Sequence, residues 1–196
     1  MVSHDLRNPL NVAEGRLDLA REECDSEHLE DIADAHARME ELIEDVLTLA
    51  QQGQPIDETE TVDLSTVANR CWQMVETTGA ELVTEDNLTF MAAEDRLQQL
   101  LENLFRNAIE HGSDDVITSV GAIDGEDGFY VADDGPGIPP EDREHVFDSG
   151  YSTANDGTGF GLAIVKEIAD AHGLTVTITE SADGGARFEF RGGESS

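Results

Sequence analysis

The first 50 residues alternate apolar and polar positions with the period of an α-helix. In residues 1–22 the apolar side chains recur every three or four residues, which places them on one face of a predicted helix: Leu6, Leu10, Ala13 and Leu17. Pro9 lies inside this pattern, and because its ring removes one backbone hydrogen bond we expect a kink there. Residues 22–27 are polar, and Asp25 and Ser26 are residues that favour the start of a helix.

A second helix is predicted from there to about residue 50. Its apolar positions follow the 3,4 spacing of a coiled-coil seam: Leu29, Ile32, His36, Met39, Ile43, Val46 and Ala50. We interpret His36 as a packed residue of this seam rather than a reactive one. Two amphipathic helices joined by so short a loop form an antiparallel hairpin. Because one hairpin cannot bury both stripes, we expect two to pair into the four-helix bundle of a homodimer.

The pattern changes after a stretch without periodicity. Residues 51–60 (QQGQPIDETE) are polar with Gly and Pro, which is typical of a linker, so we expect a boundary after residue 52 and a linker over 53–60. Residues 61–193 then alternate helical and strand patterns. Helices are predicted over 63–77, 93–111, 141–146 and 159–172. Strands are predicted over 80–84, 88–91, 116–123, 128–132, 175–179 and 186–190, with the first two flanking a turn. This order favours an α+β sandwich, in which one largely antiparallel sheet carries helices on one face.

The net charge of the chain indicates its environment and excludes one class of partner. The sequence has 44 acidic against 11 basic residues, a net charge of −33, and its acidic residues are spread along the whole length. Such a surface repels itself at ordinary ionic strength, whereas in molar salt the Debye length falls to about 3 Å. We therefore expect a protein from a halophile. A nucleic-acid binder needs a basic patch, and the sequence has none, so nucleic acid is excluded as a partner.

Other composition signals place the chain in the cytoplasm. Cys24 and Cys71 form no metal-binding pattern, and a reducing compartment is the default for such a pair. The sequence contains no run of 18 apolar residues, so we expect no membrane span, and its N-terminus lacks the features of a signal peptide.

A polar stripe on the long helix predicted over 93–111 is a candidate cation site. Asn103, Asn107 and then Glu110 and His111 recur on the face opposite the leucines. Asparagine is a poor helix former, so two at this spacing favour a function such as binding a hydrated Mg²⁺ and the phosphates that it bridges. The alternative is a solvated helix face.

Two glycine clusters lie farther along the chain. Asp133 ends a predicted strand and begins the turn with Gly135 and Gly137, where its carboxylate can accept a hydrogen bond from the exocyclic amine of a base. An Asx turn explains the same residue equally well. The second cluster, 157–162, precedes an apolar helical run, an arrangement that can bind phosphate through backbone N–H groups. A plain surface turn is the alternative there.

His4 and Asp5 are a candidate nucleophile and base on the polar face of the first helix. Imidazole titrates near neutrality and can attack a phosphoryl group, while a neighbouring carboxylate can orient it and accept its proton. A surface His beside an Asp more often has no such role.

Taken together, the motifs resemble those of the sensor histidine kinases of two-component systems. The resemblance covers about residues 2–191 and rests on five motifs in order: Ser3-His4-Asp5-Leu6-Arg7-Asn8-Pro9-Leu10, Asn103-x-x-x-Asn107-Ala108, Asp133-x-Gly135-x-Gly137, Phe147, and Gly157-x-Gly159-x-Gly161-Leu162. It implies that residues 1–52 are a dimerisation and phosphoacceptor domain. It also implies that residues 61–193 are an ATP-binding domain of the Bergerat fold, a sandwich with a mixed, mostly antiparallel sheet.

The resemblance implies a role for each motif. His4 would be phosphorylated, with Asp5 as its general base, and Asn8 would place the water that dephosphorylates the partner regulator. Asn107 would bind Mg²⁺, Asp133 would bind the adenine amine, and residues 148–156 would form a lid over ATP. The implied ATP-binding residues are Asn103, Asn107, His111, Asp133, Gly135, Gly137, Ile138, Phe147, Ser152, Thr153, Gly157, Thr158, Gly159, Phe160, Gly161 and Leu162.

Two features depart from the family pattern. Many members carry Lys or Arg near the position of Glu110 or in the lid to contact the γ-phosphate, whereas this chain offers Glu110, His111 and the hydroxyls of Tyr151, Ser152 and Thr153. The first helix of the family normally continues upstream into a sensor domain, whereas this chain starts three residues before His4. We therefore expect a truncated kinase, or one that receives its signal in trans, with a bundle weakened at this end.

Three functions are compatible with these motifs. The first is an ATP-dependent histidine kinase that passes phosphate from His4 to an aspartate in the receiver domain of a response regulator. The second is a protein that mainly dephosphorylates the regulator through Asp5 and Asn8. The third is a nucleotide-binding dimerisation module without catalysis.

Overall fold

The computed structural model describes residues 2–24, 26–50, 56, 58–75, 79–85, 88–151 and 158–192. The chain divides into two compact units, Met1–Gln52 and Gly53–Ser196.

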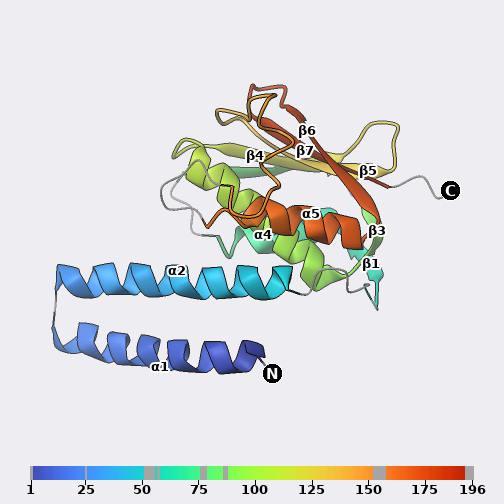
Figure 1. The fold of residues 1–196 in the computed structure, drawn as a ribbon. Helices are drawn as coiled ribbons and strands as arrows, with labels where there is room; N and C mark the ends of the chain where they lie inside the picture. The colour runs from blue at the N-terminus through green and yellow to red at the C-terminus, as the bar shows by residue number, and fades with distance from the viewer. Residues whose placement is uncertain are drawn as a thin grey trace. The chain divides into compact units, whose positions relative to one another are not determined.

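The first unit is a hairpin of two long helices, α1 (Val2–Glu23) and α2 (Glu27–Leu49), which lie side by side (Figure 1). Ser26 takes the N-cap position of α2 with an extended backbone. Helix α1 runs through Pro9 without interruption, and the kink at this residue stays a prediction. His36 is buried between the helices, and its Nε2 lies 3.0 Å from the Leu10 carbonyl oxygen, as expected of a packed seam residue.

Part of the apolar seam is left uncovered by the hairpin. Leu29 and Ile43 are half-buried, whereas Ile32, Met39 and Val46, at intervals of seven residues on α2, are 47–52% exposed. On α1, Val12 and Leu19 are likewise exposed. A coiled-coil helix with one covered and one uncovered row of apolar side chains needs a further helical surface to bury the second row.

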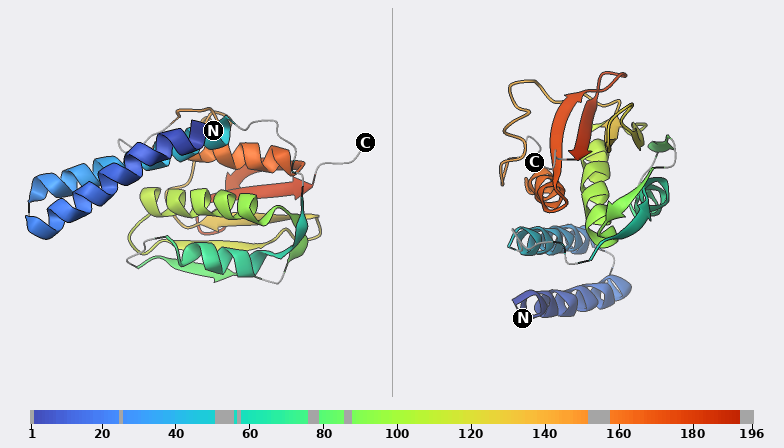
Figure 2. Two further views of the ribbon diagram at one scale, coloured as in Figure 1. Left: turned by 90° about the horizontal axis from the view of Figure 1, so that it is seen from below. Right: turned by 90° about the vertical axis from the view of Figure 1, so that its right-hand side faces the viewer.

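Among its described residues, the second unit consists of a five-stranded sheet, a separate two-stranded sheet and three helices. The five-stranded sheet has the order β2-β4-β5-β7-β6, and its strands are β2 (Glu81–Thr84), β4 (Ile117–Ala122), β5 (Gly128–Asp133), β7 (Ala186–Gly192) and β6 (Leu174–Glu180). Only β2 and β4 run parallel, while the other three pairs are antiparallel. Helices α3 (Leu64–Trp72), α4 (Glu94–His111) and α5 (Gly161–Ala171) cover one face of this sheet (Figures 1 and 2).

The core lies between these helices and the inner face of the sheet. All six predicted inward residues of α4 are buried: Leu97, Leu100, Leu101, Leu104, Phe105 and Ala108. From the sheet, the rings of Phe129 and Phe190 stack with centroids 4.6 Å apart. Each fully buried Leu or Phe contributes about 1.5–3 kcal/mol by its removal from water. This burial fixes the position of α4 on the sheet.

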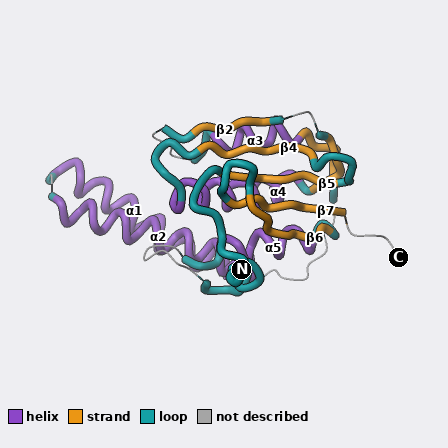
Figure 3. Tube along the Cα trace, turned by 90° about the horizontal axis from the view of Figure 1, so that it is seen from above, coloured by secondary structure: helices purple, strands orange, loops and turns teal. Residues whose placement is uncertain are grey.

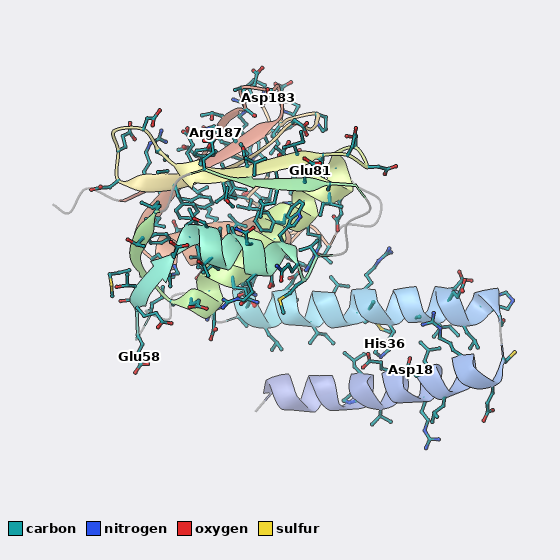
Figure 4. All side chains as sticks on the ribbon, turned by 180° about the vertical axis from the view of Figure 1, so that it is seen from behind. Asp18, His36, Glu58, Glu81, Asp183 and Arg187 are labelled. Atoms are coloured by element: carbon teal, nitrogen blue, oxygen red, sulfur yellow. The ribbon has the colours of Figure 1, made fainter. Side chains whose placement is uncertain are left out.

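The opposite face of the sheet carries none of these helices and bears a polar network, which includes Arg187 (Figure 4). The Arg187 guanidinium lies 3.5 Å from the centroid of the Tyr130 ring and donates to Glu189 at 2.8 Å. The Tyr130 hydroxyl in turn donates to Glu85, and Arg191 pairs with Glu189. This network ties β2, β5 and β7 together on the side without helices, which Figure 3 shows as a layer of strands with the helices behind it.

The two strands predicted over 80–84 and 88–91 are present, as β2 and β3 (Thr89–Ala92), but they do not pair with each other. Strand β2 pairs in parallel with β4, while β3 pairs with β1 (Glu60–Asp63). The sequence predicts no strand at β1, which begins at the last residue of the expected linker and ends at the first residue of the helix expected over 63–77. A strand pattern indicates which residues extend but not which distant strand they pair with.

Two helices also differ from their predictions. The helix expected over 63–77 is capped by Asp63, whose side chain accepts a hydrogen bond from Thr66 N at 2.7 Å, but it ends at Trp72. Its last turn closes when Met74 N donates to the Cys71 carbonyl, an i→i+3 bond. Residues 141–146 form successive turns rather than a helix. Most of their bonds also span three residues, as between His145 N and the Asp142 carbonyl.

A histidine joins the end of α5 to the start of α4. His172 Nδ1 donates to the Ile168 carbonyl at 2.8 Å, and its Nε2 accepts from Ala93 N at 3.1 Å. Both bonds require the neutral ring. The pKa of His172 is lowered from its ordinary value, mainly because burial disfavours the charged form and also because Arg96 is nearby.

This arrangement predicts a pH-dependent stability. Below pH 6.5 or so the unfolded chain binds a proton at residue 172 that the folded chain excludes, so the free energy of unfolding falls as the pH drops. The His172→Gln variant should lose this contribution, which is at most about 1.4 kcal/mol per pH unit for one proton. Urea unfolding between pH 7.5 and 5 at constant ionic strength measures it. The exposed His28→Gln serves as control, and equal slopes for wild type and His172→Gln would contradict the prediction.

Candidate functional site

Asp133 is the last residue of β5, and its carboxylate is held by two backbone N–H groups. Its Oδ1 accepts from Gly135 N at 2.9 Å and from Ala186 N, the first residue of β7, at 3.2 Å. The first of these bonds forms an Asx turn, as the sequence pattern at Asp133 also allows. The second bond goes beyond a turn, because it connects Asp133 to a different strand.

The environment of this carboxylate opposes its ionisation. Burial raises the pKa of Asp133 above its ordinary value, and the N–H groups of Ala186 and Gly135 offset part of that rise by stabilising the carboxylate. Both bonds end on the same oxygen, Oδ1. Oδ2 is therefore the oxygen that can accept a hydrogen bond from a ligand.

Two glycine turns pack against Asp133. A Cβ at Gly185 would lie 2.4 Å from Asp133 Oδ1 and 2.1 Å from the Asp133 backbone oxygen. Gly137 has a φ of +71° and faces the backbone of the turn at Gly184 and Gly185. In the sequence, Gly184 and Gly185 have the ordinary composition of a hairpin turn, so nothing there indicates that they confine a carboxylate.

The predicted polar stripe on α4 separates into residues with different surroundings. Asn103 is buried, and its Nδ2 donates to the Gln99 carbonyl at 2.8 Å, while its Oδ1 lies 3.0 Å from the position a Cβ would take on Gly161. Asn103 therefore packs against the start of α5. Asn107 is half-buried, and its Nδ2 is covered and has no hydrogen-bond partner among the described residues. His111 is exposed in the last turn.

A backbone hydrogen bond joins Gly150 to Gly159, just before α5. Gly150 N donates to the Gly159 carbonyl at 2.9 Å, and both glycines have positive φ, +85° and +71°. A Cβ on Gly159 would lie 2.8 Å from the Gly150 carbonyl carbon, so no side chain fits at this crossing. Phe160 then takes the N-cap position of α5, and Thr158 Oγ1 accepts from Phe160 N at 3.4 Å.

Several predicted site residues lie outside this geometry. Ser152, Thr153 and Gly157 lie outside the described residues. Ile138, Phe147 and Leu162 are half-buried, and the Ile138 carbonyl accepts from Arg143 Nε at 2.9 Å. In the first unit, residues 4, 5 and 8 belong to the first turns of α1, but the side chains of His4, Asp5 and Asn8 are not among those described.

The second unit therefore offers three polar features, on β5, on α4 and before α5: a carboxylate with one oxygen left for a ligand, an unpaired amide and a close glycine crossing. Comparison with known families identifies the arrangement. Residues 1–55 match the His Kinase A (phospho-acceptor) domain, and residues 92–192 match the histidine kinase-, DNA gyrase B- and HSP90-like ATPases. The chain belongs to the sensor histidine kinases.

Individual histidine kinases are similar over most of this chain. The sensor protein RstB of Escherichia coli K12 is 33% identical over 205 residues, which cover 96% of this chain and 46% of RstB. The sensor histidine kinase YkoH of Bacillus subtilis 168 is 31% identical over 193 residues, 90% of this chain and 42% of YkoH. This histidine kinase chain thus spans less than half the length of these curated relatives.

A solved kinase structure has the same architecture. Full-length ShkA in complex with AMPPNP is 29% identical, with a TM-score of 0.76 over 96% of this chain and 44% of ShkA. The predicted fold class, a helical N-terminal region followed by an α/β domain with a mixed, mostly antiparallel sheet, is therefore confirmed. Within the described ranges of the histidine kinase, no helix combines the length and the apolarity that crossing a membrane requires.

The contact between Gly185 and Asp133 predicts a steric effect on this site. In Gly185→Ala the new methyl group meets the Asp133 backbone, which cannot rotate away, so the carboxylate must shift. We expect nucleotide binding to weaken at least about tenfold and stability to fall by about 1–3 kcal/mol, the usual effect of overpacking. Titration calorimetry with ATP and thermal unfolding measure the two effects.

Gly192→Ala is the matched control, because the nearest atom to its added Cβ is 3.8 Å away. It should bind nucleotide as the wild type does. The proposed confinement of Asp133 is wrong if the two variants behave alike.

Proposed function

We propose that this chain is the kinase core of a two-component sensor, which uses ATP to phosphorylate His4 and passes the phosphoryl group to an aspartate of a response-regulator receiver domain. The observation that carries the proposal is the Asp133 carboxylate, tied through Oδ1 and left with Oδ2 to accept from an adenine amine. The phosphoacceptor and ATPase family matches support the pairing of donor and acceptor within one chain.

Each domain has a separate part in this reaction. Residues 1–52 form the dimerisation and phosphoacceptor hairpin, residues 53–60 the linker, and residues 61–193 the ATP-binding domain. The exposed rows of the hairpin, including Ile32, Met39 and Val46, support a homodimer, since a second hairpin would bury them in a four-helix bundle. Because the reaction consumes ATP, the kinase core works on the cytoplasmic side of the cell membrane.

The transfer step itself involves few residues. A ring nitrogen of His4 attacks the γ-phosphorus of ATP in line, an N–P bond forms, and the bond from phosphorus to the bridging oxygen breaks, which releases ADP. Asp5 orients the imidazole and accepts the proton that leaves its other nitrogen. Asn8, one turn farther along α1, places the water that removes phosphate from the regulator.

The nucleotide site is assigned to the motifs of the second unit. Asn107 would bind Mg²⁺, and its unpaired buried amide fits this role, because the amide can turn its oxygen toward a cation. Mg²⁺ supplies charge neutralisation for the phosphates. The remaining ATP-binding residues are Asn103, His111, Asp133, Gly135, Gly137, Ile138, Phe147, Ser152, Thr153, Gly157, Thr158, Gly159, Phe160, Gly161 and Leu162.

The lid contacts phosphate without a cationic side chain. Residues 148–161 contain no Lys or Arg. The contacts therefore fall to backbone N–H groups at the start of α5 and to the hydroxyls of Tyr151, Ser152 and Thr153.

Incubation with γ-labelled ATP and Mg²⁺ in molar KCl tests the proposal. The wild type should take up label that is labile to acid and stable to base, as expected of phosphohistidine. His4→Gln should lose all of it, and Asn107→Ala should lose most through weaker nucleotide binding. The control His28→Gln, an exposed histidine of α2, should keep the label.

Two outcomes would contradict the kinase. No label, with dephosphorylation of the regulator intact and lost in Asn8→Ala, would indicate a phosphatase. Nucleotide binding without either activity would indicate a non-catalytic dimerisation module.

The charge of the chain supports an origin in a halophile. With 44 acidic and 11 basic residues, the carboxylates outnumber the cationic side chains four to one. Several basic residues are already paired, as in Arg70 with Glu94 and Lys166 with Asp170. The remaining repulsion must be screened by salt.

We therefore expect the protein to lose structure as salt is removed. Circular dichroism should show a native spectrum in 2–3 M KCl and loss of helix below about 0.2 M, where the Debye length exceeds roughly 7 Å. Sucrose at equal osmolality separates screening from the exclusion of a cosolute and should not restore the helix. A spectrum that stays native at low salt would overturn the halophile proposal.

A further inference from the structure

A histidine occupies the middle of the α2 row that packs against α1. The members of this row lie seven residues apart, at Leu29, His36 and Ile43. Leu29 and Ile43 are half-buried, whereas His36 is buried, with 6% of its surface exposed, between the two helices (Figure 4). A polar side chain at such a position lowers the stability of an apolar seam unless it is hydrogen-bonded.

The hydrogen bond of His36 crosses from one helix to the other. Its Nε2 lies 3.0 Å from the carbonyl oxygen of Leu10 in α1, 26 residues earlier in the chain. Because a carbonyl oxygen only accepts, Nε2 carries the proton and donates. The bond therefore joins α2 to the backbone of α1 rather than to one of its side chains.

A hydrogen bond between two helices fixes more than an apolar contact does. Apolar side chains tolerate small shifts along or around a helix axis, whereas a hydrogen bond weakens steeply as its angle and distance depart from the optimum. A single polar residue in a coiled-coil seam can thus specify the register of its helices at some cost in stability. In this hairpin, the bond from His36 fixes the axial position and the rotation of α1 against α2.

The anchored carbonyl lies close to the residue proposed to be phosphorylated. Leu10 follows His4 by six residues, which is about 9 Å along the axis of one helix. Helix α1 is continuous from Val2 to Glu23, so a shift or rotation at Leu10 is carried to residue 4. Phosphoryl transfer is sensitive to such a shift, because a misplacement of about 1 Å can lower a rate about a hundredfold.

We propose that His36 is a positioning residue for phosphoryl transfer, which holds α1 through the Leu10 carbonyl in the register that brings His4 into line with the γ-phosphate. This inference rests on the proposed ATP-dependent function. His36 acts through the backbone of α1 and takes no part in the bonds that form and break.

A purely structural reading of His36 exists beside this one. The bond to the Leu10 carbonyl then only satisfies a buried polar group in the seam. The two readings differ in what an apolar replacement does. Under the structural reading, phosphoryl transfer in His36→Leu changes only as far as stability changes. Under the positioning reading, transfer slows in a hairpin that is at least as stable as that of wild type.

The test follows label transfer from γ-labelled ATP to His4 at saturating ATP, with Mg²⁺ in molar KCl. His36→Leu should take up label about 10- to 100-fold more slowly than wild type. Its affinity for ATP, measured by titration calorimetry, should stay within about twofold, because the proposed nucleotide site belongs to the other unit. Its unfolding midpoint should equal or exceed that of wild type, because an apolar side chain replaces a buried polar one.

Two further variants separate the hydrogen bond from packing. His36→Gln keeps a side-chain N–H that can donate to a backbone carbonyl, so it should restore most of the rate of transfer. Ile43→Leu changes the next member of the same row by a volume-conserving swap and removes no hydrogen bond, so it should take up label as wild type does.

The inference fails if His36→Leu transfers phosphate as fast as wild type. It also fails if the rate falls together with stability and His36→Gln does not restore it. If wild type itself takes up no label at His4, the proposed function fails, and the role of His36 fails with it.

Discussion

The confinement of the Asp133 carboxylate is the constraint on which the site depends. A carboxylate withdrawn from water needs hydrogen-bond donors, and both donors here are backbone N–H groups from separate segments, at Gly135 and Ala186. The β6–β7 hairpin must therefore approach β5 closely enough that residue 185 has no room for a Cβ. Strand pairing of β5 with β7 positions this approach, and the stacked rings of Phe129 and Phe190 stabilise the pairing.

Close packing also excludes side chains in the segment before α5. Where Gly150 and Gly159 cross, a Cβ on Gly159 would meet the Gly150 backbone, while at Gly150 it is the positive φ that disfavours a side chain. Asn103 likewise approaches Gly161 at the start of α5. Backbone N–H groups are the donors that remain where side chains are excluded. Under the proposed function, such backbone donors would let a chain with a large excess of acids bind phosphate without Lys or Arg in residues 148–161.

The sequence predicted what depends on local pattern. The leucine face of α4, the β4–β5 and β6–β7 hairpins and the two helices of the first unit were all readable from periodicity and turn residues. The partners of β2 and β3 were not, because β2 pairs with a strand more than thirty residues away and only tertiary packing selects it. Gly185 was missed for a related reason: its role arises from contact with Asp133, 52 residues earlier in the sequence.

Asn107 shows how a signal in the sequence and the three-dimensional structure can agree. An asparagine in mid-helix conflicts with local propensity, and in the structure its Nδ2 is covered and has no hydrogen-bond partner among the described residues. Gly185 is the opposite case, because a glycine in a hairpin turn obeys the local rules, and only its contact with Asp133 shows that no other residue fits there. Local rules are broken most often where a site requires it, and a residue that obeys them can be recognised as part of a site only from three-dimensional contacts.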